Sequence, residues 1–456
     1  MITVGGIGSG LDVESLVSQL VQAERQGADN RYARMAASTS TEISAFGALR
    51  GAMSSVESAL SSFSDDGVVT RRKATTSSSE HFTASASASA SAGVYDVKVK
   101  ALATAHKLAS GAYAGLDTAV GTGSLSVTVG DSSLELTLDG DNNSLAGIRD
   151  AINNADDNPG VRATTIKDDD GYHLVLTATV TGLDNQISVT RSGGDGGLDS
   201  LVYDPGTLTN LSQKQEALNA EIELEGFSYS SSSNTVEDAI EGVTINLQQV
   251  DTDSSYTLTV SVDDNAIVSA LNNFVSAFNT GRNLVNSLSA YNAASGSAGV
   301  LQGDALTRGL QSRLRDLAFA DYSASNTAYS ALGEIGIAFD SSGALSVDAT
   351  AFKSALSTNF DDVVGMLTGE GGIRANFETV LGGYLDSDGL FDSRADSLSS
   401  RQARIATQQE ALDRRMEQVE ARLRRQFTAL DGLVAQLNTT SNFLTQQLAG
   451  LSGSNS

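Results

Sequence analysis

The sequence predicts an α+β protein in which both ends of the chain form a long helical coiled-coil leg, with antiparallel β-rich head domains inserted between them. Apolar residues recur at seven-residue spacing from Leu398 to Leu451, near the end of the chain. A similar stripe runs from Phe46 to Phe63, near its beginning. The residues between these two stretches are rich in valine, threonine, serine and glycine, and they alternate as strands do.

The C-terminal stretch predicts one long helix that buries a narrow stripe against another helix. Its main line of positions is Met416, Leu423, Leu430, Leu437, Leu444 and Leu451, and Phe427, Val434, Ser441 and Leu448 fall between them. No proline interrupts this stretch, so a continuous helix would be roughly 80 Å long at about 1.5 Å per residue. An intramolecular coiled coil and a surface that pairs with other subunits both fit this pattern.

The N-terminal stretch supplies a partner of the same kind. Asp12 is predicted to cap a helix that ends near Gly27, and a second helix is predicted from about Asn30 to Phe63. The stripe of this second helix is Phe46, Leu49, Met53, Val56, Leu60 and Phe63. We therefore expect the two ends of the chain to pack against each other.

The middle of the chain is predicted to be β-rich, with one short helix at Leu145–Asn154. Strands are predicted at residues 94–99, 125–129, 133–138, 161–168, 173–179, 186–190, 221–224, 243–250 and 256–262. The alanine–serine run at residues 83–92 fits either a linker or a strand of small residues.

Helical periodicity returns after this region, at about residues 267–288, 306–317, 349–367 and 373–385, with a β-like hairpin near residues 335–347. The predicted domains are an N-terminal leg segment (1–42), an N-terminal helix of the helical leg domain (43–70), an inner head domain in two parts (71–105 and 215–264), an outer head domain (106–214), the rest of the helical leg domain (265–396) and a C-terminal coiled-coil helix (397–456).

Composition excludes several classes of function. Net charge is −26 over 456 residues, so phosphate backbones and anionic lipid would repel the surface, and we expect neither nucleic acid nor membrane as a partner. Cysteine is absent, which removes thiolate chemistry and disulfides. The first residues show no secretory signal peptide, and no apolar run is long enough to span a bilayer. We expect a protein that leaves the cell, if it does, without a cleaved signal.

No catalytic, cofactor or metal site is predicted. His81, His106 and His173 stand outside any nucleophile or metal motif. Residues 139–143 alternate oxygen ligands as calcium loops do, but Ser144 stands where such a loop needs glycine. An acidic turn that caps the following helix fits better, and calcium binding stays open.

Arginines cluster along the C-terminal helix of this acidic chain. They are Arg401, Arg404, Arg414, Arg415, Arg422, Arg424 and Arg425. They are interpreted as the solvated edge of a coiled coil or, alternatively, as groups that meet acidic faces of neighbouring subunits.

Five segments together resemble one family, the bacterial flagellar filament cap proteins (FliD, hook-associated protein type 2). The segments are Gly8–Val13 with Leu16–Glu24, Gly93–Ala103 followed by a linker with His106, Asn234–Leu247, Leu332–Asp348 and Phe427–Gln447. They are spread over nearly the whole chain and keep the order of the family, and each is moderately specific by itself.

The resemblance implies a non-enzymatic cap at the distal tip of the flagellum, exported through the type III channel. It implies a ring of roughly four to six copies that helps exported flagellin to fold and insert. Implied partners are other copies, flagellin, hook–filament junction proteins, an export chaperone on the C-terminal helix and a host surface ligand. The predicted partner-binding and oligomer-binding residues are Leu11, Leu16, Leu20, Phe46, Leu49, Met53, Val56, Leu60, Leu423, Phe427, Leu430, Val434, Leu437, Leu444 and Leu448.

Two alternatives remain at this point. One is another flagellar axial protein, flagellin or a hook–filament junction protein, because these also have helical ends around a variable middle. The other is a surface adhesin that uses the β-rich head, a role that is compatible with capping.

Overall fold

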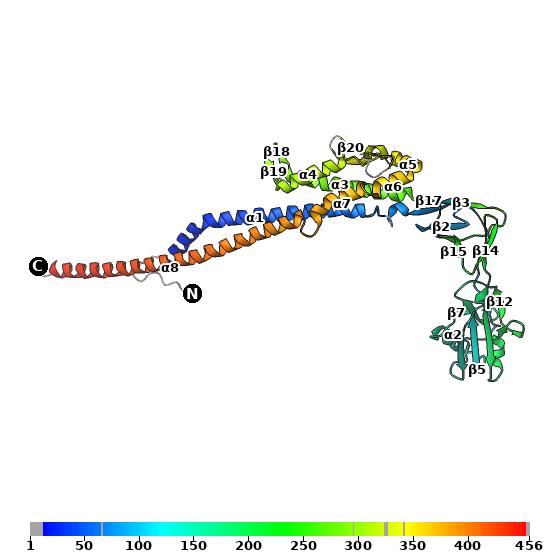
Figure 1. The fold of residues 1–456 in the computed structure, drawn as a ribbon. Helices are drawn as coiled ribbons and strands as arrows, with labels where there is room; N and C mark the ends of the chain where they lie inside the picture. Colours follow the sequence, from blue (N-terminus) through cyan, green and yellow to red (C-terminus); the bar gives the residue numbers. More distant parts are fainter. Residues whose placement is uncertain (1–11, 65–66, 295, 323–326, 341–342, 453–456) are drawn as a thin grey trace. The chain divides into compact units, whose positions relative to one another are not determined.

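The chain forms two compact units in the computed structural model (Figure 1). Unit 1 joins Met1–Ser64 to Ile267–Ser456, and unit 2 is the inserted segment Asp65–Ala266. The structure describes residues 12–64, 67–294, 296–322, 327–340 and 343–452. None of the helices in these ranges is both long and apolar enough to cross a membrane.

Unit 1 is mostly helical. Its elements are α1 (Val13–Ser61), α3 (Asp264–Ser289), α4 (Ala305–Ala318), η5 (Leu332–Ile335), α5 (Ala349–Thr358), α6 (Phe360–Thr368), α7 (Ile373–Leu385) and α8 (Leu390–Ser452), with the hairpins β18–β19 (Tyr291–Asn292, Ser297–Ala298) and β20–β21 (Ile337–Phe339, Leu345–Val347). The segment predicted as one helix from 349 to 367 is divided at Asn359, and the final helix begins at Leu390, before its predicted periodic stretch.

Helix α1 is continuous, so the predicted break near Gly27 is wrong. Asp12 caps the helix as predicted, because its Oδ1 accepts a hydrogen bond from the backbone N–H of Ser15 at 3.0 Å. A helical glycine costs only about 1 kcal/mol relative to alanine. The Arg25–Asp29 ion pair, at 2.6 Å, spans the glycine with the i,i+4 spacing that supports a helix. Without a proline, this small local cost does not end the helix.

The core of unit 1 brings α1 against α3 and α7. Phe274, Phe278 and Phe377 meet at tilted or edge-on angles with ring centroids 5.2–6.3 Å apart. Met53 of α1 packs against the glycine at position 281 of α3, and a Cβ at Gly281 would lie 2.5 Å from the Met53 Cε. The N-terminal stripe is thus part of a packed helical core.

Unit 2 contains two β cores, and all its strand pairs are antiparallel as predicted. The first core lies between the sheet β1-β17-β3-β13-β14 and the sheet β15-β16-β2. These strands are β1 (Arg72–Thr76), β2 (Phe82–Ala86), β3 (Gly93–Ala101), β13 (Ala220–Leu224), β14 (Phe227–Ser231), β15 (Thr235–Ile240), β16 (Val243–Leu247) and β17 (Tyr256–Val262). The alanine–serine run begins as β2, so it is a strand for its first half.

The second core packs α2 (Leu145–Asn154) with two more sheets, β11-β10-β9-β5-β6 and β12-β4-β8-β7. Their strands are β4 (Lys107–Ala109), β5 (Gly123–Val129), β6 (Ser132–Leu138), β7 (Val161–Lys167), β8 (Tyr172–Ala178), β9 (Ile187–Ser192), β10 (Tyr203–Asp204), β11 (Leu208–Thr209) and β12 (Ser212–Gln215). The two strands predicted at residues 125–129 and 133–138 are present as β5 and β6, and they pair as a hairpin with Gly130 at φ +56° in its turn.

Candidate assembly surface

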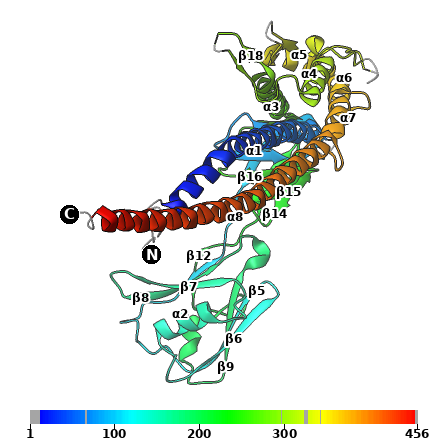
Figure 2. The same cartoon turned by 90° about the vertical axis from the view of Figure 1, so that its left-hand side faces the viewer.

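The leg of unit 1 is built from α1 and α8, which run side by side and antiparallel (Figures 1 and 2). Ion pairs between them define the register, because the start of α1 meets the later part of α8. Glu14 pairs with Arg424 at 3.1 Å, Arg25 with Asp413 at 2.9 Å, and Glu42 with Arg401 at 3.4 Å. Arg50 pairs with Asp392 at the other end. Exposed pairs of this kind contribute at most about 1 kcal/mol each, so they specify register more than stability.

Five of the predicted partner-binding residues lie in the buried part of this leg. Phe46, Leu49, Met53, Val56 and Leu60 are at most 4% exposed. The Arg394 guanidinium of α8 covers the Phe46 ring, with its Cζ 5.1 Å from the ring centroid. These five side chains are therefore covered within a single copy of the chain.

The other predicted residues on α8 are only partly covered. Leu423, Phe427 and Val434 are half-buried. The other four are exposed: Leu430 (48%), Leu437 (60%), Leu444 (54%) and Leu448 (66%). The register explains the difference, because α1 begins at Val13, close to the level of Arg424, and α8 continues to Ser452.

At the start of α1, Leu16 is half-buried and Leu20 is 46% exposed. Leu11 lies outside the described residues. The predicted partner-binding residues did not include Val17, which is 1% exposed in this part of the leg, nor the exposed Leu433 and Phe443 on α8. Leu433 continues the alternating spacing of three and four from Leu430 and was readable from the same pattern.

We define the α8 stripe as Leu430, Leu433, Leu437, Leu444 and Leu448. Its members recur at steps of three, four or seven, which place them on one face of the helix. Contiguous exposed apolar residues on a helix mark a surface that another protein covers. The stripe is therefore the candidate assembly surface of unit 1.

The arginines of α8 divide between two situations. Arg401, Arg415 and Arg424 pair with acidic residues of α1, and Arg414 pairs with Glu410 in its own helix. Arg404, Arg422 and Arg425 form no ion pair within the described part of the chain. Three of the seven arginines are thus used in the intrachain contact between α1 and α8.

The three histidines have structural surroundings in the β-rich unit. His106 is 1% exposed, and its Nδ1 accepts a hydrogen bond from the backbone N–H of Ile187 at 2.9 Å. Burial lowers the pKa of His106, which keeps the ring neutral. His173 donates from Nδ1 to the Ser110 carbonyl oxygen at 2.8 Å, and this bond, with Asp168 at 3.0 Å, raises its pKa.

His81 stacks on the Tyr256 ring with the centroids 4.2 Å apart, and the Tyr256 hydroxyl donates to Asp251 at 2.7 Å. In the acidic turn at 139–143, the side-chain oxygens of Asp139 and Asn142 accept hydrogen bonds from backbone N–H groups of the turn itself. Ser144 caps α2 by accepting from the Gly147 N–H at 3.1 Å. Within the described ranges, histidines, aspartates and glutamates form no cluster that could hold a metal ion.

A helical leg with an exposed apolar stripe, joined to β-rich domains, is typical of assembly proteins, which act by binding other protein subunits. Comparisons with known proteins identify the family. The profile of the flagellar hook-associated protein 2 N-terminus matches residues 9–106, and that of its C-terminus matches residues 217–439. The profile of the flagellin hook IN motif matches residues 124–180.

Relatives cover almost the whole chain. The B-type flagellar hook-associated protein 2 of Pseudomonas aeruginosa PAO1 is 33% identical, over 98% of this chain and 97% of the relative. The flagellar hook-associated protein 2 of Escherichia coli K12 is 32% identical, over 98% of each. The crystal structure of the flagellar cap protein FliD D1-D2-D3 domains from E. coli has a TM-score of 0.64 at 30% identity, and covers 78% of this chain and 99% of that chain.

The chain belongs to the flagellar hook-associated protein 2 family, the FliD filament cap proteins. This confirms the predicted resemblance, the α+β fold with helical ends, and the function as a structural cap protein of the flagellum rather than an enzyme. It places the protein outside the cell at the tip of the flagellum. Flagellin, a junction protein and an adhesin, as alternatives to a cap, are not favoured.

Proposed function

We propose that several copies of this chain form a closed ring at the distal end of the filament, and that the α8 stripe contacts the filament end. Capping is a property of the ring, and the cap promotes folding and insertion of exported flagellin beneath it. The ring contains roughly four to six copies, the size that the family resemblance suggests for a closed cyclic assembly. The observation that carries the proposal is the α8 stripe.

The energetics of the α8 stripe favour an exchangeable contact. Full burial of a leucine side chain stabilises by about 1.5–3 kcal/mol. The five leucines are already about half covered in the single chain, so each gains roughly half of that when a partner covers it. The total is enough to hold a subunit at the filament end, while any one leucine can be released when a flagellin subunit enters.

The remaining predicted residues take two roles in this proposal. Phe46, Leu49, Met53, Val56 and Leu60 hold the leg rigid within each copy. Leu11, Leu16 and Leu20 on the N-terminal side, with Leu423 to Leu448 on α8, face flagellin, hook–filament junction proteins or neighbouring copies. An isolated helix end has little to bury in a single chain, so contact with the partner stabilises it.

The same exposed end of α8 is the segment that an export chaperone would cover before the chain leaves the cell. We propose export through the flagellar type III channel without a cleaved signal peptide, the route that the family resemblance implies. The β-rich unit 2 carries exposed side chains that a host surface ligand would contact.

The test is electron microscopy of the purified full-length protein in negative stain. Closed rings with protruding legs would support the proposal and give the number of copies directly. Long filaments would contradict it in favour of a filament-forming axial protein. Single particles at micromolar concentration would contradict self-assembly by the chain alone.

A further inference from the structure

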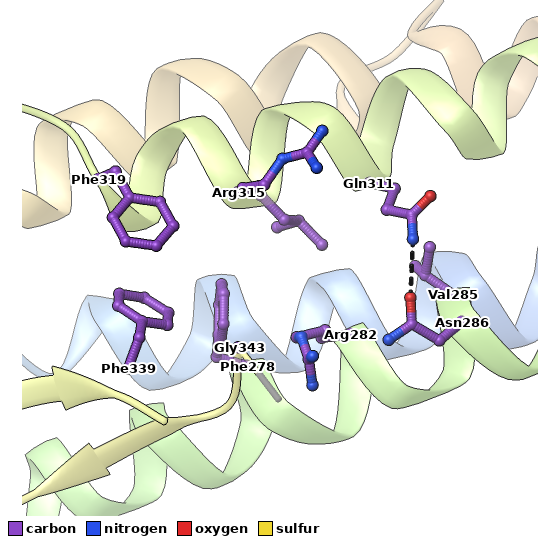
Figure 3. Close-up of a pocket in the computed structure, with 10 residues that line it drawn as sticks. Phe278, Arg282, Val285, Asn286, Gln311, Arg315, Phe319, Phe339 and Gly343 are labelled. Atoms are coloured by element: carbon purple, nitrogen blue, oxygen red, sulfur yellow. Dashed lines mark hydrogen bonds between the residues drawn. The ribbon is translucent and has the colours of Figure 1, made fainter. Parts of the chain in front are cut away.

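A pocket of about 370 Å³ opens in unit 1 between α3, α4 and the β20–β21 hairpin (Figure 3). At one end, the rings of Phe319 and Phe339 face each other with centroids 5.2 Å apart, and Phe278 lies 6.3 Å from Phe339. At the other end, Gln311 Nε2 donates to Asn286 Oδ1 at 2.9 Å. We call this site the α3–α4 pocket.

Two arginines, Arg282 from α3 and Arg315 from α4, line the middle of the pocket (Figure 3). Neither forms an ion pair with the described residues, although the chain has 55 acidic and only 29 basic residues. Arg282 makes one long side-chain hydrogen bond, to Asn283 at 3.4 Å. Two cations next to an aromatic wall suit a partner group that brings an apolar side chain together with carboxylates.

The aromatic wall of the pocket is partly exposed. Phe319 is 72% exposed, whereas Phe278, which also lines the pocket, is 2% exposed. Exposed aromatic residues beside arginines are typical of the central contacts of protein interfaces. The α3–α4 pocket therefore has the composition of a docking site for another protein surface.

Unit 2 carries a surface with the complementary chemistry. The β13–β14 hairpin turns at Glu225 and Gly226, with φ of +51° and +84°, and it presents Phe227 at 78% exposure. Two acidic residues belong to the same surface. The backbone N–H of Glu225 donates to the carbonyl oxygen of Asp96 at 3.0 Å, the backbone N–H of Asp96 donates to the Glu225 carboxylate at 2.6 Å, and Asp96 is exposed. We call this surface the hairpin knob.

We propose that the hairpin knob of one copy docks in the α3–α4 pocket of the neighbouring copy. Phe227 would add to the wall of Phe319 and Phe339, and the carboxylates of Glu225 and Asp96 would approach Arg315 and Arg282. Knob and pocket are different surfaces of the same chain, so the contact is head-to-tail, and head-to-tail contacts that close generate rings. This inference rests on the proposed ring and names one of its contacts.

The absence of cysteine from the chain allows a direct test. One full-length protein carries Phe227→Cys and a second carries Phe319→Cys, and the two are mixed, assembled and treated with a short thiol-to-thiol crosslinker. We expect a crosslinked pair that contains one copy of each protein. Ile166→Cys replaces Phe227→Cys in the control, because Ile166 is also an exposed apolar residue of unit 2, at 54%.

If rings form but the yield of crosslinked pairs is no higher than in the Ile166→Cys control, the contact of the hairpin knob is overturned and the proposed ring is not. Failure of the unmodified protein to form any ring would overturn both.

Charge reversal gives a second readout. We expect Arg315→Glu to weaken ring formation at least about tenfold, because two attractions become repulsions, and Glu225→Arg in the same chain to restore part of the loss. Arg313→Glu, on the same helix but outside the pocket lining, should weaken it much less. Equal effects of Arg313→Glu and Arg315→Glu, or no rescue, would contradict the assignment.

Discussion

Leu437 and Leu444 offer the sharpest perturbation of the proposed leg contact. They are 60% and 54% exposed in the single chain, and they lie seven residues apart on the α8 stripe. We predict that Leu437→Asp and Leu444→Asp each weaken attachment of the cap to the filament end. A partner that covers the stripe removes about half of a leucine surface from water at each position.

The magnitude follows from that area. Half of the value for a fully buried leucine is about 0.75–1.5 kcal/mol per residue. A variant with both substitutions therefore loses at least about 1.5–3 kcal/mol per chain, which is roughly a 10-fold to 150-fold weaker attachment. Burial of an aspartate carboxylate at the contact adds to the loss, so these figures are lower limits.

The assay measures retention of labelled cap protein on sheared filaments over a concentration series. Gln436→Asp is the matched control, because it adds the same charge beside Leu437 without removing an apolar side chain from the α8 stripe. Thermal unfolding of unit 2, followed by circular dichroism, shows whether the head is unchanged. Loss of the head transition in either leucine variant, or equal attachment of the leucine variants and Gln436→Asp, would refute the reasoning.

Three further predictions concern stability. Gly27→Ala should raise the stability of α1 by about 1 kcal/mol, because a Cβ there meets nothing within 4 Å, and an unchanged or lower melting temperature would contradict a continuous helix. Met53→Ala should destabilise unit 1 by about 2–5 kcal/mol through the cavity it leaves, measured by denaturant unfolding, with the transition of unit 2 as the internal control. The pKa of His106 is lowered, so the contribution of His106 to stability is present above about pH 6.5 and is lost as pH falls below that value. The pKa of His173 is raised, so the contribution of His173 is present below about pH 6.5 and is lost as pH rises through the folded-state pKa. Midpoints of unit 2 unfolding measured across pH should therefore show less acid sensitivity in His106→Asn and more in His173→Asn, and the same slope in both variants would contradict these assignments.

Periodicity predicted the helical ends of the chain, because a stripe with alternating steps of three and four needs only the local sequence. The predicted break at Gly27 was wrong because a cost of about 1 kcal/mol is small beside the packing of a helix that runs from Val13 to Ser61. The short edge strands, such as β12 at Ser212–Gln215, carry no apolar alternation and were missed for that reason.

The extent of the exposed stripe was not readable from the heptads. The seven-residue spacing continues unchanged from Met416 to Leu444, although the first is 4% exposed and the second 54%. The difference depends on the point along α8 at which α1 begins, and exposed ion pairs such as Glu14–Arg424 specify that register. A single sequence does not show which charged residues of two distant helices will pair with each other.

The α3–α4 pocket was missed because its lining comes from three elements that are separated along the chain. The available signal was weak: an acidic chain with isolated arginines beside phenylalanines at residues 278–282 and 315–319. Such a pattern occurs equally in a packed helical core, and only the structure shows that Phe319 is exposed while Phe278 is buried.

Hydrogen exchange measured on the free protein and on the protein bound to filament ends tests the central claim most directly. We predict that amides around residues 430–448 exchange quickly in the free chain and become protected on the filament, since a partner then covers the α8 stripe. Amides around residues 46–60, which carry the buried stripe of α1, should be protected in both states. Equal exchange of residues 430–448 in the free and bound states would contradict the assignment of the α8 stripe as the surface that holds the cap on the filament.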